Sequence, residues 1–320
     1  MKITRFIAIS LVFFILLAGC GRKPKSTETS NGTTTQGTTG TTSDSTNGNP
    51  DETTPNETLP GQTEEASEEP TGPVQPEPAN RTPQLDTELL DKLDNTTKGW
   101  WIQLNSDHET PYIPKDIKEL IAKYDAYYVA DTSEKVVYLT FDEGYENGYT
   151  PLILDTLKEN DVQAVFFITS QYIKQNADLI QRMLDEGHIV GNHSVNHPSL
   201  PDKDYEGIIK EICGLEEMFE EKFGKGFKYF RPPQGNYSER TLAATQQLGY
   251  KTVFWSFAYD DWDVTKQRGA DYAYNIVMKN LHNGAIFLLH AVSKDNAEAL
   301  DSIIKGIRAE GYEIKLLDLE

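Results

Sequence analysis

The sequence predicts an α/β fold built on a parallel sheet of about seven strands, beginning near residue 135 of the 320-residue chain. From that point, short apolar stretches alternate with stretches of ten or more residues that have helical periodicity. Several of the short stretches are apolar throughout, as expected for strands that helices cover on both faces. An α/β barrel and an open doubly wound sheet both satisfy this pattern, and the spacing of the elements does not choose between them.

The expected strands are rich in β-branched and aromatic residues: 136–141, 162–168, 188–191, 228–230, 251–255, 285–290 and 312–317. The connections 174–187 and 297–311 have helical periodicity and the length that a crossover between parallel strands requires. Upstream, residues 96–134 contain several aromatic side chains and one amphipathic helical stretch within 115–129. We expect this segment to be an extension packed on a main domain of residues 135–320.

Residues 1–19 have the layout of an export signal, in which Lys2 and Arg5 precede an apolar run that ends at Leu17. The run is shorter than the roughly 20 residues of a membrane-spanning helix. The letters LAGC that follow resemble a bacterial lipobox, so we expect lipid on Cys20 and attachment at the outer face of the cell membrane. An ordinary secretory peptide that contains a cysteine is the alternative.

Residues 20–95 form a low-complexity stretch rich in Thr, Ser, Pro and Glu, with too few large apolar residues to build a core. We expect a disordered linker between the lipid and the domain. The other cysteine, Cys213, lies in a helical stretch and is expected to be a buried free thiol. The net charge of −20 argues against nucleic acid as a partner, because phosphates require a basic surface. We expect a monomer.

Polar side chains gather directly after the expected strands, where parallel sheets place their functional groups. They are Asp142, Glu143, His193, His197, Arg231, Asp260, Asp261, Trp262 and His290. His193 and His197 are four residues apart, so both imidazoles can reach one ion, and a neighbouring carboxylate would complete a two-histidine, one-carboxylate metal site. A pair of surface histidines or loop caps is the other explanation for this spacing.

In chain order, these residues fall in five motifs that resemble those of carbohydrate esterase family 4, the NodB-type polysaccharide deacetylases. The motifs are TFDEG at 140–144, HSVNH at 193–197, RPPQG at 231–235, AYDDW at 258–262 and LLH at 288–290. The resemblance implies a distorted (β/α) barrel and the hydrolysis of N-acetyl groups on polysaccharide amino sugars. The stretches YENGYTP, FWSFAYDDW and HAVSKDNAEAL are similar to the branch that acts on N-acetylmuramic acid in peptidoglycan glycan strands, which serves muramic δ-lactam formation in spore-formers.

The resemblance also implies roles for individual residues. Asp142 would be the general base, and Arg231 would keep its carboxylate ionised. His193, His197 and Glu143 would hold a divalent metal, zinc by default.

Further roles follow from the other motifs. The backbone N–H of Gln234 would donate to the oxyanion, while His290 would protonate the leaving amine and Asp261 would orient that imidazole. Tyr145 and Trp262 would contact the sugar.

The sequence departs from the family pattern at two positions. Glu143 stands where the family has a metal-binding aspartate, and Ala258 stands where the fourth motif commonly begins with aspartate. Two alternatives therefore stay open: a deacetylase of N-acetylglucosamine in peptidoglycan or exopolysaccharide, and a catalytically silent sugar-binding lipoprotein. A lipid-anchored adhesin or transport protein would leave the placement of the histidines and carboxylates unexplained.

Overall fold

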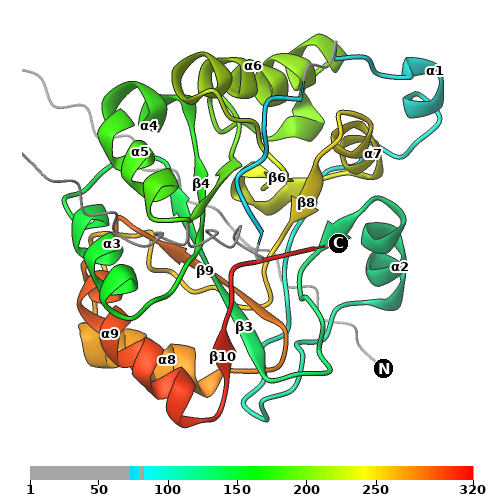
Figure 1. Ribbon diagram of the computed structural model, residues 1–320. Coiled ribbons are helices and arrows are strands. Elements are labelled where there is room, and N and C mark those ends of the chain that lie inside the picture. The colour runs from blue at the N-terminus through cyan, green and yellow to red at the C-terminus, as the bar shows by residue number, and fades with distance from the viewer. Residues whose placement is uncertain (1–72, 80–82, 320) are drawn as a thin grey trace, which may run out of the picture. The chain divides into compact units, whose positions relative to one another are not determined.

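The computed structural model describes residues 73–79 and 83–319 (Figure 1). The predicted signal peptide, Cys20 and most of the predicted linker lie outside the described residues. Within the described ranges, no helix combines the length and the apolar character needed to cross a bilayer.

The core is one parallel sheet with the order β10-β3-β4-β5-β6-β8-β2, and β9 pairs with β3. Its strands are β2 (Ala126–Tyr127), β3 (Val136–Glu143), β4 (Val165–Ile168), β5 (Ile189–Asn192), β6 (Tyr229–Phe230), β8 (Lys251–Val253), β9 (Ala285–His290) and β10 (Glu313–Ile314). All seven predicted strands are present, and β2 is an eighth strand from the segment before the main domain. Several ends differ: β3 extends two residues past its predicted end and includes both Asp142 and Glu143.

The sheet curls until its two sides meet, which confirms a distorted parallel barrel. Beyond β8 the chain continues alongside β9, where the Ser256 N–H donates to the Ile286 carbonyl at 3.0 Å and the Leu288 N–H donates to the Phe257 carbonyl at 2.9 Å. Nearer the start of β9, the residues after β2 fill the gap, since the Ala130 N–H donates to the Gly284 carbonyl at 2.9 Å. The carboxyl ends of the strands therefore converge on one rim.

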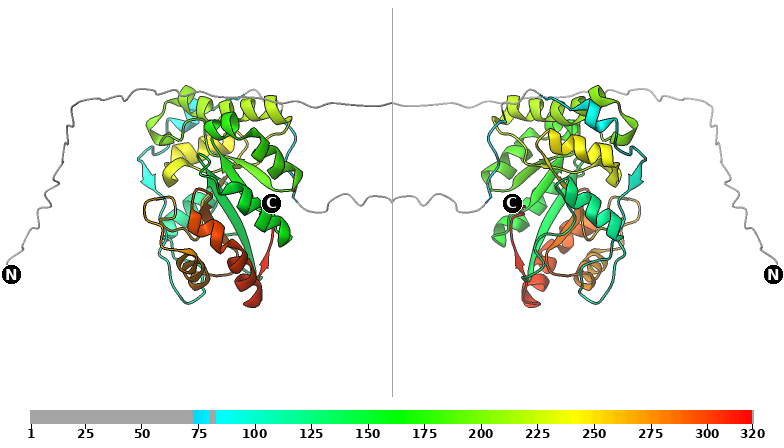
Figure 2. Two further views of the ribbon diagram at one scale, coloured as in Figure 1. Left: turned by 90° about the vertical axis from the view of Figure 1, so that its left-hand side faces the viewer. Right: turned by 90° about the vertical axis from the view of Figure 1, so that its right-hand side faces the viewer.

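Helices lie around the outside of the strands (Figures 1 and 2). They are α1 (Thr87–Leu90), α2 (Lys115–Lys123), α3 (Thr150–Glu159), α4 (Ser170–Gln175), α5 (Ala177–Asp185), α6 (Tyr205–Phe223), α7 (Glu239–Gln247), α8 (Ala270–Lys279) and α9 (Lys294–Ala309). The start of α6 is capped by Asp204, whose carboxylate accepts the Gly207 N–H at 2.8 Å, and its end is marked by Gly224 with φ 64°. Cys213 is a buried free thiol on this helix, and burial raises its pKa to about 12.

The packed part of the chain begins before residue 95, the predicted end of the linker. Gln75 extends the edge of β5: its side-chain carbonyl accepts the Val190 N–H at 2.6 Å, and its amide donates to the Val190 carbonyl at 3.0 Å. Leu90 on α1 is fully buried. The predicted linker boundary is therefore too late, because a few well-placed side chains anchor a segment whose average composition is polar.

Candidate active site

The rim of the barrel holds a cavity of about 570 Å³ at the carboxyl ends of the strands. Seven of the predicted site residues line it: Asp142, Tyr145, His193, His197, Gln234, Trp262 and His290. Arg231 and Asp261 are buried beside lining residues to which they are hydrogen bonded. Glu143 does not line the cavity. The remaining wall is largely apolar and was not predicted; it includes Trp255, Leu288 and Val292.

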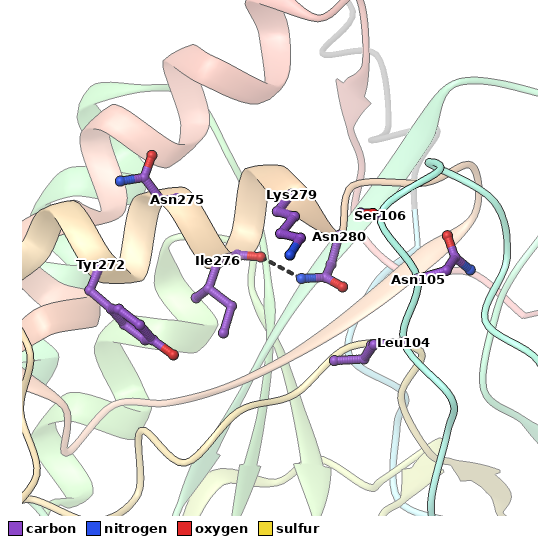
Figure 3. Close-up of a pocket in the computed structure, with 8 residues that line it drawn as sticks. All are labelled: Leu104, Asn105, Ser106, Tyr272, Asn275, Ile276, Lys279 and Asn280. Atoms are coloured by element: carbon purple, nitrogen blue, oxygen red, sulfur yellow. Dashed lines mark hydrogen bonds between the residues drawn. The ribbon is translucent and has the colours of Figure 1, made fainter.

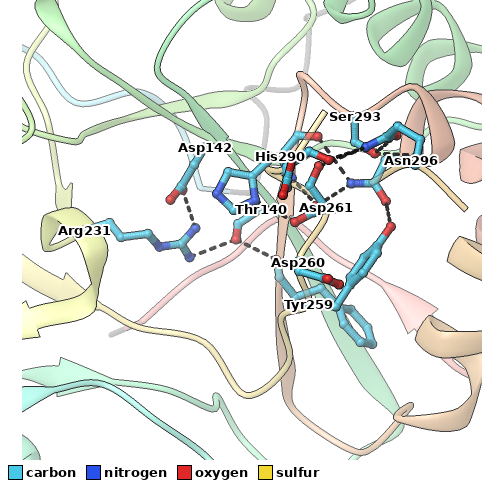
Figure 4. A network of polar contacts seen from close by, with 12 residues as sticks. Thr140, Asp142, Arg231, Tyr259, Asp260, Asp261, His290, Ser293 and Asn296 are labelled. Carbon is cyan, nitrogen blue, oxygen red and sulfur yellow. Dashed lines mark hydrogen bonds and ion pairs between the residues drawn. The ribbon is translucent and has the colours of Figure 1, made fainter. Parts of the chain in front are cut away.

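Asp142 is held by a fully buried arginine (Figure 4). Arg231 Nη1 donates to Asp142 Oδ1 at 2.8 Å, and Nη2 donates to the Thr140 hydroxyl at 2.8 Å. Burial alone would raise the pKa of Asp142, but the positive charge of Arg231 and the neighbouring histidines outweigh it, and the net pKa is lowered. The site thus contains an ionised carboxylate whose second oxygen, Oδ2, lies 3.4 Å from His193 Nε2.

The two histidines direct their Nε2 atoms at each other. His193 Nδ1 lies 2.8 Å from the Arg231 carbonyl, which can only accept, so Nδ1 carries the proton and Nε2 presents a lone pair. His197 Nε2 lies 3.1 Å from His193 Nε2. Burial lowers the pKa of His193 to about 4, and burial also lowers the pKa of His197. Two neutral imidazole nitrogens therefore converge, which fits the donors that a divalent cation such as zinc prefers.

Backbone strain is concentrated in the loops that border this cavity. Ser194, His197 and Gln234 are three of the six non-glycine residues with positive φ in the described part, with φ between 58° and 67°. Local hydrogen bonds hold the histidine loop, where the His197 N–H donates to Ser194 Oγ at 2.9 Å. Such conformations cost about 1–3 kcal/mol each and persist only where the surroundings fix them. The site is therefore preorganised, because the surrounding structure holds its loops in these conformations.

His290 forms a second pair with the buried Asp261 (Figure 4). His290 Nδ1 donates to Asp261 Oδ1 at 2.8 Å, and the His290 backbone N–H donates to Oδ2 at 2.7 Å. Asn296 also donates to Oδ2, a contact that no separate signal in the sequence predicted. Burial alone would lower the pKa of His290, but the charge and hydrogen bond of Asp261 outweigh it, and the net pKa is raised. Since His290 is the direct register partner of Asp142, a proton donor faces a proton acceptor.

The structure does not place Glu143 beside the two histidines that were predicted to hold a metal with it. Neighbouring residues of a strand point to opposite faces, so Glu143 turns away from the side on which Asp142 meets Arg231. Its buried carboxyl accepts a hydrogen bond from the Thr150 hydroxyl at 3.2 Å, and burial raises its pKa well above the usual range. Across residues 73–79 and 83–319, no group of three or more His, Cys, Asp or Glu side chains has the arrangement of a metal site. His193 and His197 remain as candidate ligands from the predicted set.

Two exposed aromatic side chains stand at the cavity rim. Tyr145 is 43% exposed and Trp262 is 59% exposed, so both can stack against a sugar ring without first losing packing. Asp260, next to Asp261 in sequence, pairs instead with Arg268. Asp260 therefore belongs to a surface ion pair, whereas Asp261 belongs to the site.

A second cavity of about 520 Å³ lies between residues 104–106 and α8 (Figure 3). Asparagine side chains, Tyr272, Ile276 and Lys279 contribute to its lining, which contains no carboxylate or imidazole from the described residues. Of these two cavities, only the first is lined by a carboxylate and by imidazoles.

Comparison with known proteins agrees with this geometry. A family profile described as polysaccharide deacetylase matches residues 129–253. The chain is 50% identical over 220 residues to an uncharacterized 30.6 kDa protein of Geobacillus stearothermophilus, covering 68% of this chain and 83% of the relative. It is 47% identical over 225 residues to the peptidoglycan-N-acetylmuramic acid deacetylase PdaA of Bacillus subtilis, covering 70% and 86%. The solved structure of PdaA, a family 4 carbohydrate esterase, matches with a TM-score of 0.69 over 70% of this chain and 96% of that chain.

A third similar protein shows that likeness to this family does not by itself establish turnover. It is a family 4 pseudoenzyme of Bacillus anthracis, 28% identical, with a TM-score of 0.56 over 60% of this chain and 67% of that chain. The present chain keeps an ionised carboxylate, Asp142, and a histidine of raised pKa, His290, side by side on adjacent strands at one cavity. Its identity and coverage relative to PdaA place the chain in the polysaccharide deacetylases of carbohydrate esterase family 4.

Proposed function

We propose that this hydrolase removes the acetyl group of N-acetylmuramic acid in peptidoglycan, as a step toward muramic δ-lactam. The observation that carries the proposal is the placement of Asp142 and His290 as register partners on adjacent strands at one cavity, with pKa values shifted apart so that one is a base and the other an acid. Opposite shifts of this kind assign acid and base roles. The choice of muramic acid is supported by the 47% identity to PdaA.

The chemistry requires three events at an amide. Asp142 accepts a proton from the attacking water, and the backbone N–H of Gln234 donates to the oxygen of the tetrahedral intermediate. His290, charged beside Asp261, gives its proton to the departing nitrogen, without which an amine is a poor leaving group. Tyr145 and Trp262 provide stacking surfaces for the sugar ring.

His193 and His197 would hold a divalent cation, with zinc as the default choice. When bound, the cation would polarise the acetamide carbonyl and lower the pKa of a coordinated water. The orientation of His193 for this role comes from the Arg231 carbonyl, which fixes its proton on Nδ1.

The metal proposal makes a paired prediction. Protein purified with zinc is expected to contain bound zinc, and His193→Ala is expected to lose most of it, because one of two donors is removed. Glu143→Gln is the matched control. Its zinc content is expected to equal that of the wild type, since the Glu143 carboxyl is hydrogen bonded to Thr150 and does not line the cavity. Elemental analysis after dialysis measures both. Zinc lost from Glu143→Gln but kept by His193→Ala would contradict the assignment of ligands.

We also propose that the chain is exported, anchored by lipid on Cys20 and monomeric, with its activity directed at the nearby wall. Cys20→Ser is expected to move the protein from the membrane fraction to the soluble fraction, because no other lipid attachment would remain. Immunoblots of fractionated cells measure this. A variant that stays with membranes as the wild type does would show that anchoring does not depend on Cys20.

The substrate is tested by comparing acetate release from two glycans. Peptidoglycan strands freed of peptide present N-acetylmuramic acid, whereas a chitin oligomer presents N-acetylglucosamine alone. We expect release from the first at a rate well above the second. Equal rates would reject the muramic assignment, and no release from either would favour a silent sugar-binding protein.

A further inference from the structure

We propose that Trp100 is a positioning residue for the reaction: it holds the loop of residues 232–236, which we call the oxyanion loop, in its reactive conformation. The inference rests on the proposed role of the Gln234 N–H. It assigns a function to the segment that precedes the family domain, because Trp100 lies outside residues 129–253.

The oxyanion loop has an unusual backbone. Gln234 and Gly235 are consecutive residues with positive φ, 59° and 68°. Glycine adopts this region without strain, whereas glutamine does not, so the conformation of Gln234 must be held by its surroundings. Both residues line the cavity, and the direction of the Gln234 N–H depends on this backbone.

The segment containing Trp100 is bonded directly to that loop. The Trp100 N–H donates to the Gly235 carbonyl at 2.8 Å. Just before it, β1 (Lys98–Gly99) pairs antiparallel with β7 (Asn236–Tyr237), which directly follows Gly235. The space beside the Cα of Gly235 is also filled, since a Cβ built on Gly235 would lie 3.1 Å from the Trp100 Cβ and 2.9 Å from the Trp255 ring.

The Trp100 side chain contacts a second segment, residues 254–255. Trp100 as a whole is 8% exposed; its ring stacks on Phe254 with centroids 4.2 Å apart, and its indole N–H donates to the Trp255 carbonyl at 3.0 Å. The Phe254 carbonyl in turn accepts from Arg231 Nη2 at 3.3 Å. Trp100 therefore joins the oxyanion loop, which its backbone contacts, to the backbone that holds the arginine of the catalytic carboxylate, which its side chain contacts.

Loss of this connection should disturb chemistry more than binding. A transition-state donor acts only when it is aimed at the developing charge, and a displacement near 1 Å can cost about 10²-fold in rate. For Trp100→Ala in the full chain we expect kcat for acetate release to fall about 10–100-fold while KM changes by less than about threefold. Trp100→Phe keeps the ring over Phe254 and is expected to recover most of kcat.

Phe219→Ala is the matched control, since Phe219 is a fully buried aromatic on α6 that stacks on Phe227 at 4.3 Å and does not line the cavity. Kinetics are measured well below the melting temperature of each variant. We expect Phe219→Ala to lose thermal stability but to keep wild-type kcat once corrected for folded protein. An equal kcat for the two alanine variants would overturn the inference.

Amide hydrogen exchange provides a readout that does not depend on activity. A peptide spanning residues 232–236 is expected to exchange faster in Trp100→Ala than in the wild type, and to be unchanged in Phe219→Ala. If the peptide of residues 232–236 exchanges its amide hydrogens at the wild-type rate in Trp100→Ala, the positioning role is overturned even if the enzyme is active. A wild type that releases no acetate rejects the proposed function instead, and the exchange comparison still decides whether Trp100 holds the loop.

Discussion

Asp142→Asn is expected to lower kcat for acetate release by about 10²–10⁴-fold, the range typical of a lost general base. The amide keeps the shape of the carboxylate but cannot accept the proton of the attacking water. The loss of charge also leaves the buried Arg231 without its ionic partner, so part of the stability is expected to be lost. Steady-state acetate assays, together with circular dichroism to confirm folding, measure both effects.

Glu143→Gln is the control, because it makes the same chemical change one residue along the chain. Glu143 lies off the cavity, and burial favours its uncharged form, which an amide imitates well. We expect activity within about threefold of the wild type, as for a neutral hydrogen-bonded exchange. Equal losses for the two variants would contradict the separation of roles between these adjacent carboxylates.

His290→Ala is expected to reduce kcat by a similar factor, because the amine must then leave without a proton from the enzyme. The pH profile gives a finer test. The pKa of His290 is raised by Asp261, so the active imidazolium form persists above its usual range and activity falls as pH rises through the folded-state pKa. Asp261→Asn removes the charge that opposes burial, so the alkaline limb should move to lower pH. If Asp261→Asn leaves the alkaline limb at the wild-type pH, the limb reports a group other than His290.

The parallel strands and the residues at their ends could be predicted from the sequence, because apolar runs and glycine turns are local signals. Strand β9 runs over the predicted residues, and its last residue is His290. The end of β3 was harder to predict, since Asp142 and Glu143 are polar and precede a glycine, which is typical of a turn. Once both lie in the strand, alternation of side chains separates them, and this is why Asp142 meets Arg231 while Glu143 meets Thr150.

Contacts made over long sequence distances were not predictable. The side-chain amide of Gln75 is hydrogen bonded to β5 across a sequence separation of 115 residues. The indole of Trp100 is hydrogen bonded to Trp255 across a separation of 155 residues. Neither segment has a periodicity that predicts such a partner. Asn296 is likewise an ordinary helix residue until the fold places it against Asp261.

The most direct test of the account is mass spectrometry of peptide-free peptidoglycan strands treated with the purified protein. We predict that muramic residues lose their acetyl groups, that N-acetylglucosamine residues keep theirs, and that Asp142→Asn leaves both unchanged. Loss confined to glucosamine, or a loss that Asp142→Asn produces as well as the wild type does, would contradict the account.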